Sequence, residues 1–257
     1  MMESLPILHG GLRRPKVCAL SAPMPRTSTE PEFDEFAADY QAALQKGLRL
    51  TGEDSAYYAS GRCRWTAARA SAEAMKVGRV LDFGCGTGTA TRFLLEAFPG
   101  CEVFGTDPSE ASLEVARQDH AGLGARFILP QDLAQAGAVD LAYCNGVFHH
   151  IPPTDRPGAA RSVFEALRPG GWFALWENNP WNPMVWYVMS RVPFDRDAIM
   201  LWPGETEDLL RGAGFELVVT RFWFVFPAFL AALRPLEPLL SSWPLGGQYV
   251  VLARKPL

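Results

Sequence analysis

The sequence has no hydrophobic segment long enough for a membrane-spanning helix or for the core of a signal peptide. Its longest apolar run, FWFVFPAFLAAL at 222–233, falls well short of the roughly 20 residues that a membrane-spanning helix needs. The apolar stretch VCALSA at 17–22 is too short for the core of a signal peptide. We therefore expect a soluble, cytoplasmic protein, and contact with a membrane surface is left open.

The sequence also lacks a block of like charge and a paired cysteine motif. Lys and Arg total 24 against 28 Asp and Glu, a net charge of -4, whereas phosphate contacts require a basic face. The five cysteines are scattered without a Cys-x-x-Cys pair, which is typical of reduced thiols in a cytosolic protein. We expect no nucleic-acid partner and no metal ion, and a homodimer is left open.

Composition divides the chain into three parts. Residues 1–30 are rich in Pro, Ser and Arg and have no periodicity, which predicts a flexible tail; whether Met24 is the true start is left open. Between 31 and 76 apolar residues recur at helical spacing, which predicts a helical cap. Residues 77–257 form the expected core, with apolar insertions near 181–202 and 226–245.

The core alternates strands with helices. Strand-like apolar runs are expected at 78–83, 102–106, 125–129, 139–144, 171–177, 215–225 and 246–256. Helical segments are expected near 89–98, 109–119, 131–136, 156–168 and 204–213. This order is typical of a parallel sheet with helices on both faces. We predict an α/β fold: a Rossmann-like, seven-stranded, mostly parallel sheet with one antiparallel edge strand, in three α/β/α layers.

A glycine turn follows the first expected strand, in the stretch VLDFGCGTGTAT at 80–91. Gly84, Gly86 and Gly88 offer a tight turn and bare backbone against which a ligand can lie. Their G-x-G-x-G spacing differs from the G-x-G-x-x-G of dinucleotide-binding turns. Asp82, two residues before the turn, would repel a pyrophosphate but could bind an ammonium group. A ligand with an amino-acid end and an adenosine end suits this pattern.

This stretch resembles motif I of the class I S-adenosylmethionine-dependent methyltransferases, and the segments PWNP and PLGGQY, at 180–183 and 244–249, resemble a bacterial small-molecule group of them. The resemblance covers residues 60–177 and implies S-adenosyl-L-methionine as cofactor. It implies that Asp82 lies near the methionine amino group and that the glycine backbone passes beneath the cofactor. VDLAYCNGVFHHI at 139–151 resembles the family's fourth-strand motif, and ALRPGGWFAL at 166–175 the turn before its fifth strand.

Two further carboxylates stand at expected strand ends. Asp107 lies about 20 residues beyond the glycine turn, where a carboxylate accepts hydrogen bonds from ribose hydroxyls. Asp132 stands where the resemblance implies a contact with the adenine amino group, although it could instead cap the next helix. The expected cofactor-binding residues are Asp82, Gly84, Cys85, Gly86, Gly88, Asp107, Pro108, Asp132, Leu133 and Asn145.

Catalytic and acceptor-binding candidates follow the fourth and fifth strands. His149 or His150 could take a proton from an attacking hydroxyl or amine, although either ring could instead only pack or hydrogen-bond within its loop. Glu177, Asn178 and Trp181 are candidate acceptor contacts.

The expected function is methyl transfer from S-adenosylmethionine to a small acceptor by in-line displacement. The apolar segments at 181–202 and 222–245 favour a hydrophobic acceptor, such as a polyketide, aromatic or lipid-like molecule of secondary metabolism, although they could equally form core or a dimer face. Oxygen, nitrogen and carbon are all open as the acceptor atom. Alternatives are a cyclase or decarboxylase that uses the sulfonium as a charge, a cofactor-binding partner without catalysis, and an NAD-binding reductase.

Overall fold

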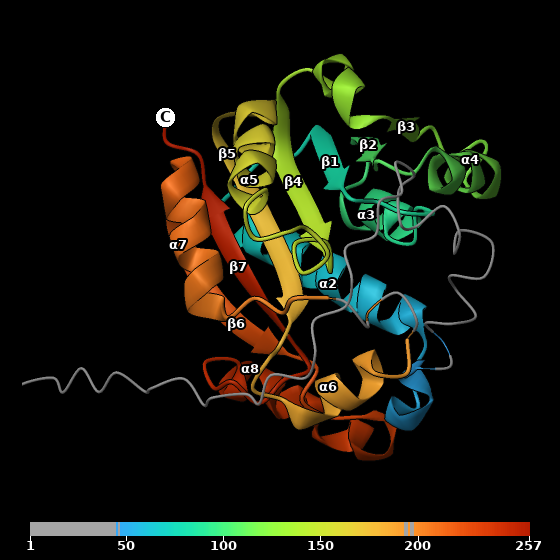
Figure 1. Ribbon diagram of the computed structural model, residues 1–257, viewed down its shortest axis with the longest axis vertical. Helices are drawn as coiled ribbons and strands as arrows, with labels where there is room; N and C mark the ends of the chain where they lie inside the picture. Colours follow the sequence, from blue (N-terminus) through green and yellow to red (C-terminus); the bar gives the residue numbers. More distant parts are fainter. Residues whose placement is uncertain (1–44, 46, 193–194, 196–197) are drawn as a thin grey trace, which may run out of the picture. The chain divides into compact units, whose positions relative to one another are not determined.

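A seven-stranded sheet in the order β3-β2-β1-β4-β5-β7-β6 organises the computed structural model (Figure 1). The structure describes residues 45, 47–192, 195 and 198–257, so the expected tail and the first part of the expected cap lie outside it. The strands are β1 (Arg79–Phe83), β2 (Glu102–Thr106), β3 (Arg126–Ile128), β4 (Val139–Asn145), β5 (Leu167–Asn178), β6 (Glu216–Trp223) and β7 (Gln248–Arg254).

The α-helices are α2 (Ser55–Ala72), α3 (Thr91–Ala97), α4 (Glu110–Asp119), α5 (Arg156–Ala166), α6 (Pro183–Met189), α7 (Pro203–Ala213) and α8 (Glu237–Leu240). Short 3-10 helices are η2 (Arg49–Thr51), η3 (Pro130–Ala136) and η5 (Ala228–Leu236). Every expected strand and helix of the core is present, and the predicted α/β fold is confirmed. The expected segment at 131–136 is a 3-10 helix.

One strand runs against the rest of the sheet. β1 to β5 pair in parallel, whereas β7 pairs antiparallel with both β5 and β6. The reversed strand therefore lies one position inside the edge, and β6 forms the edge itself.

The fifth helix ends two residues before the expected position. α5 ends at Ala166, and Leu167 already adopts extended backbone geometry and pairs with Val139 of β4. Proline disfavours helical geometry in the residue before it, so Arg168 extends the strand. The end of the expected helix and the turn expected after it are thus the start of β5.

Alternation along the central strands builds one apolar layer on each face of the sheet. On β5, Phe173 and Leu175 join the layer under α5 and α7, whereas Trp172, Ala174 and Trp176 join the layer under α2 and α3 (Figure 1). Side chains two residues apart share a face of a strand, so a strand buried on both sides reads as a continuous apolar run. This explains why the central strands are apolar throughout.

The helix α2, which belongs to the expected cap segment, packs directly on the sheet. Its residues Ala59, Cys63 and Ala70 are buried in the same layer as Phe93 and Leu94 of α3. The expected cap segment therefore contributes one of the helices that cover this face of the sheet.

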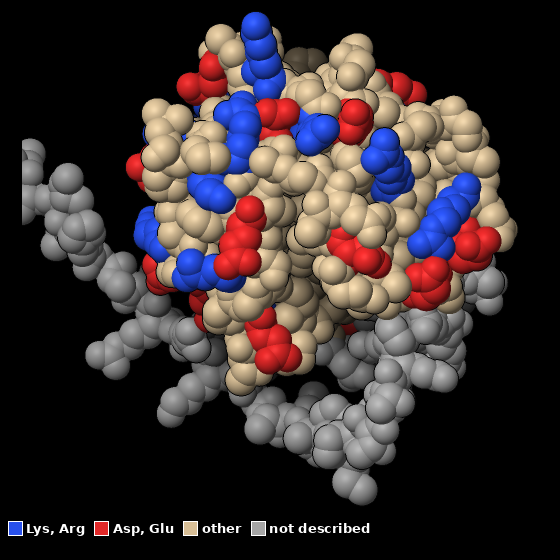
Figure 2. All heavy atoms as spheres, turned by 90° about the horizontal axis from the view of Figure 1, so that it is seen from above, with Lys and Arg blue, Asp and Glu red and all other residues tan. Residues whose placement is uncertain are grey.

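Large apolar side chains remain exposed in the two expected insertions. They are Trp181, Met184, Trp186, Tyr187 and Ile199 in the first, and Phe229, Leu230, Leu233, Leu236, Leu239, Trp243 and Leu245 in the second. Among the described residues, no helix has both the length and the apolar character needed to cross a membrane. On the face drawn in Figure 2, basic and acidic side chains are intermingled, and neither sign forms a separate patch.

Candidate active site

The glycine turn after β1 is held against the end of β2. The Gly84 and Cys85 amides both donate to the carbonyl oxygen of Thr106, at 2.7 and 3.0 Å. Gly84, Gly86 and Gly88 all have positive φ angles, of 72°, 52° and 78°, which L side chains adopt only with strain. The sequence pattern therefore reflects a real backbone requirement.

The three glycines face different surroundings. A Cβ at Gly84 would lie 2.4 Å from Val147, and a Cβ at Gly88 would lie 2.7 Å from the ring of His120. A Cβ at Gly86 would meet no atom of the structure within 4 Å. The middle of the turn therefore presents bare backbone to open space, which is what a ligand lying on the turn requires.

Asp82 sits buried at the end of β1, beside Tyr143 of β4, with its side chain 3% exposed. Its Oδ2 has no hydrogen-bond partner among the residues that the structure describes. Burial raises the pKa of Asp82 to about 7, and the Asp107 carboxylate adds to the rise while Arg62 opposes it. A buried carboxylate with an unused oxygen is costly by itself and calls for a positively charged partner.

Asp107 links the ends of β1 and β2. Its Oδ2 accepts from the Gly86 amide at 2.9 Å, and its Oδ1 accepts from the Ser109 amide at 2.9 Å. These two contacts fix the Asp107 side chain between the glycine turn and the start of α4. Pro108, the next residue, is exposed, whereas Ser109 caps α4 through the Ser112 amide.

Three other residues expected to contact the cofactor differ in their surroundings. Asp132 lies in η3 half-buried, and its Oδ1 accepts from Gln135 at 3.1 Å. Leu133 packs against the layer under α5 and α7. The Cys85 side chain is buried among Leu113, Ala116 and Phe127.

A polar network that includes Tyr143, the neighbour of Asp82 on β4, joins segments that no local pattern connects. Arg62 of α2 donates to the Tyr143 hydroxyl at 2.9 Å and to Gln248 Oε1 at 2.8 Å. Gln248 in turn donates to the side-chain oxygens of Asn145 and Asn178, each at 3.3 Å. Our sequence analysis missed Arg62 and Gln248, because no motif surrounds them and their contacts span 81 and 186 residues.

The loop after β4 lies against the glycine turn, because Val147 occupies the space beside Gly84. Glu177, at the end of β5, fixes this loop: its Oε1 accepts from the Phe148 amide at 2.8 Å, and its Oε2 lies 2.5 Å from His149 Nδ1. Glu177 is only 1% exposed. The side chain expected to touch the acceptor is therefore engaged in orienting His149.

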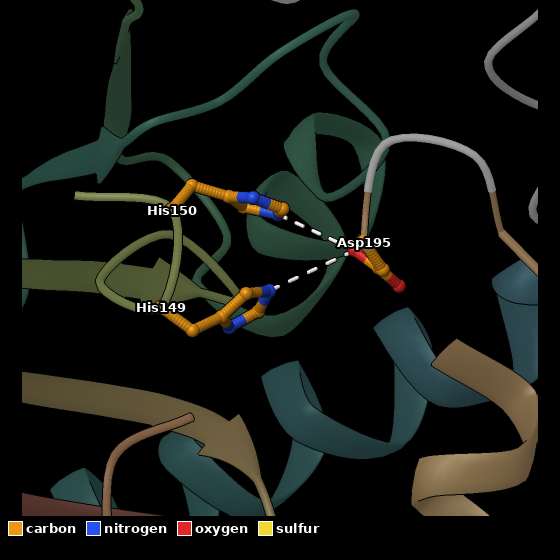
Figure 3. A group of neighbouring side chains, drawn as sticks. All are labelled: His149, His150 and Asp195. Carbon is orange, nitrogen blue, oxygen red and sulfur yellow. Dashed lines mark ion pairs between the residues drawn. The ribbon is translucent and has the colours of Figure 1, made fainter. Parts of the chain in front are cut away.

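His149 and His150 both face Asp195 (Figure 3). Asp195 Oδ1 lies 3.8 Å from His149 Nε2 and 3.4 Å from His150 Nε2. Burial by itself would lower the pKa of His149, but Glu177 and Asp195 reverse this and raise it to about 10. Burial would raise the pKa of Asp195, but the two imidazoles hold it below its usual value. Our sequence analysis missed Asp195.

The other expected acceptor contacts lie further along the same edge. Asn178 accepts from Gln248, and Trp181 is half exposed, with its ring centroid 5.2 Å from that of Trp202. Asn179 instead binds the carbonyl oxygens of Pro244 and Gly246, so it anchors the second insertion. The structure thus brings most expected site residues to the carboxyl edge of β1, β2, β4 and β5, which is where open α/β sheets bind ligands.

Comparison with known proteins agrees with this geometry. Residues 81–173 match the family model described as a methyltransferase domain. These residues are a methyltransferase domain. The matched range contains the glycine turn, Asp107, the two histidines and most of β5. The family expected from the sequence is confirmed for this part of the chain.

Relatives of the methyltransferase domain cover the chain to different extents. A trans-aconitate 2-methyltransferase of Variovorax paradoxus is 40% identical over 104 residues, which is 39% of this chain and 38% of that protein. The chain therefore spans well under half the length of this curated relative.

Two solved structures share the fold. An S-adenosylmethionine-dependent methyltransferase from Mesorhizobium loti has a TM-score of 0.53 and 23% identity, covering 75% of this chain and 98% of that one. Magnesium protoporphyrin IX methyltransferase from Synechocystis PCC 6803, solved with bound S-adenosylhomocysteine, has a TM-score of 0.58 and 19% identity. The latter match covers 87% of this chain and 96% of that one.

Proposed function

We propose that the methyltransferase domain binds S-adenosylmethionine and transfers its methyl group to a small acceptor. The observation that carries this proposal is that Asp82 and the open backbone at Gly86 both lie at the carboxyl end of β1. A buried carboxylate oxygen without a partner among the described residues stands at the strand end from which an open glycine backbone begins. A ligand with an ammonium group could pair with the carboxylate, and its extended nucleoside could lie on the open backbone.

The other contacts follow from the same placement. The Asp82 carboxylate would hold the ammonium group of the cofactor, and Asp107, fixed by Gly86 and Ser109, would accept from the ribose hydroxyls. Asp132 would lie at the adenine, with Pro108 and Leu133 beside it. Asn145, held by Gln248, would close the site from β4.

The bound cofactor supplies an activated methyl group on a sulfonium. The protein's task is then to align the acceptor and exclude water, and a general base is needed only when the acceptor's proton must leave early. Glu177 contributes by fixing the loop of His149 and His150 against the glycine turn. These histidines would therefore face the acceptor rather than the nucleoside.

For the acceptor we propose a small molecule with an apolar body, such as an aromatic, polyketide or lipid-like compound of secondary metabolism. Half-exposed aromatic rings follow β5, among them Trp181 and Trp186, and aromatic side chains predominate where proteins bind apolar ligands. The relative from Variovorax paradoxus is named for trans-aconitate, so this tricarboxylate is the natural competitor to test. The cytoplasmic location and the absence of a nucleic-acid partner stay predictions.

Calorimetric titration with S-adenosylmethionine, S-adenosylhomocysteine and NAD, each alone, tests the cofactor. We expect micromolar binding of the two sulfur compounds and none of NAD; the reverse pattern in folded protein would overturn the proposal. Acceptors are then screened by mass, with trans-aconitate and apolar phenols side by side, and a gain of one CH2 identifies methylation. A product of altered structure without that gain would favour a cyclase or decarboxylase.

A further inference from the structure

We propose that His149, His150 and Asp195 form a binding site for one divalent transition-metal ion. Nitrogen from two imidazoles and oxygen from one carboxylate is a donor set that binds zinc and ferrous iron in proteins. The inference concerns binding and is independent of the proposed methyl transfer.

The three donor atoms converge on one point. His149 Nε2, His150 Nε2 and a carboxylate oxygen of Asp195 lie within 4.8 Å of one another, and both imidazoles point to the same side chain (Figure 3). They come from two places in the chain, the loop after β4 and the segment after α6, so only the tertiary structure assembles them.

The distance from Asp195 to His150 is that of neighbouring metal ligands, and the distance to His149 is a few tenths of an ångström longer. Asp195 Oδ1 lies 3.4 Å from His150 Nε2 and 3.8 Å from His149 Nε2, whereas N–H···O hydrogen bonds measure about 2.7–3.2 Å. Metal bonds of about 2.1 Å place neighbouring ligand atoms about 3.0–3.4 Å apart at octahedral and tetrahedral angles. A small closing movement of one side chain would complete the site.

The surroundings of His149 supply the second requirement of a metal site. Metal-binding histidines usually donate their other ring N–H to a carboxylate, which orients the ring. Glu177 Oε2 lies 2.5 Å from His149 Nδ1 and is itself held by the Phe148 amide through the other carboxylate oxygen. His149 therefore presents only Nε2 to Asp195.

Three protein ligands leave coordination positions for water or for an oxygen of a bound molecule. The two histidines lie in the loop that packs against the glycine turn, at the carboxyl edge of the sheet, and Asp195 reaches them from the segment after α6. A metal ion held here would face the acceptor side of the site. An acceptor with a hydroxyl or carboxylate oxygen could complete its coordination.

The test uses untagged full-length protein freed of metal with a chelator. We expect calorimetric titration with Co2+ or Zn2+ to show one bound ion per chain, and Co2+ to develop visible absorption bands of a nitrogen- and oxygen-ligated ion. Mg2+, which prefers oxygen ligands, should not displace it. Absence of Co2+ and Zn2+ binding by folded wild-type protein would overturn the proposal.

Variants decide whether these residues are the ligands. His150→Gln and Asp195→Asn should abolish the binding, and Glu177→Gln should weaken it at least about tenfold. His120→Gln, at a histidine of the described chain outside the cluster, is the matched control and should bind Co2+ as wild type does. Circular dichroism confirms that each variant is folded, and metal should raise the melting temperature of wild type but not of His150→Gln. Undiminished binding in both His150→Gln and Asp195→Asn would overturn the assignment.

Discussion

At the scale of single residues, Asp82 is a buried carboxylate with a strongly raised pKa. It is 3% exposed, and its Oδ2 has no partner among the described side chains and amides. Burial raises its pKa to about 7, from an ordinary value of 3.8. In the cofactor-free protein, the folded state thus keeps a proton that the unfolded state releases between these two pH values. The contribution of Asp82 to the free energy of unfolding therefore decreases as pH rises from 3.8 towards 7. Above pH 7 it does not change further.

The pH dependence of cofactor binding follows from the same residue. In the proposed site the ammonium group of S-adenosylmethionine would bind the ionised Asp82 carboxylate, so affinity should rise as pH increases through 7. We expect binding about tenfold weaker at about pH 6 than at about pH 8, measured by calorimetry. Asp82→Asn should bind weakly at both values and show no such step. A wild-type affinity that stays constant across this range would contradict the role of Asp82.

Gly86 and Gly100 allow a matched test of the glycine turn. Both have positive φ, of 52° and 82°, and a Cβ at either would meet no atom within 4 Å. Alanine at either position should therefore destabilise the fold by about 1 kcal/mol through backbone strain, measured by urea unfolding.

Of these two glycines, only Gly86 lies on the proposed cofactor surface. Gly86→Ala should weaken S-adenosylmethionine binding more than about tenfold, because a methyl group holds the cofactor off the backbone. Gly100→Ala should bind as wild type does. Equal affinities in the two variants would place the cofactor elsewhere.

At the scale of elements, α2 is tied to the sheet by a buried guanidinium as well as by its apolar face. Arg62 is 7% exposed and reaches Tyr143 of β4 and Gln248 of β7, and Gln248 continues to Asn145 and Asn178. One helix thereby sets the position of three strand ends. The element that the sequence assigns to a cap is part of the support of the site.

Removing this guanidinium should cost stability that an exposed arginine of the same helix does not provide. Arg62→Met leaves the Tyr143 hydroxyl and the Gln248 oxygen without their donor and should lower the free energy of unfolding by about 2–3 kcal/mol. Arg64→Met, at an exposed position of α2, is the control and should change it by less than about 0.5 kcal/mol. Urea unfolding compares the two. Similar values would mean that the apolar face alone holds α2.

At the scale of the molecule, the sheet collects the proposed cofactor and acceptor sites on one edge. The carboxyl ends of β1 and β2 hold Asp82 and Asp107, and those of β4 and β5 hold Asn145 and Glu177. The two apolar insertions follow β5 and β6, and Asn179 anchors one to the other through Pro244 and Gly246. The proposed division, in which the matched domain binds the cofactor and the insertions bind the acceptor, therefore follows the topology.

The sequence by itself determined the features that are formed by residues close together in the chain. Apolar runs on buried strands, the glycine turn and the carboxylates at strand ends are all local, because a strand, a turn and a helix start occupy consecutive residues. These features predicted the bounds of the seven strands to within a few residues. They also predicted that Asp82, the three glycines and Asp107 lie at strand ends or in the turn between strand and helix. Even here, the helix was expected to run to residue 168 and the strand to begin at 171, whereas β5 begins at Leu167.

Only the tertiary structure decided the contacts between distant segments. Arg62 with Gln248, His149 with Glu177, and the two histidines with Asp195 have no local pattern, because each side chain takes its role from a partner that the sheet topology brings to it. Glu177 therefore orients a loop although it stands where an acceptor contact was expected. The order of strands, with β7 between β5 and β6, is likewise set by packing. Local sequence fixed the elements, and long-range hydrogen bonding and burial decided which of their side chains meet.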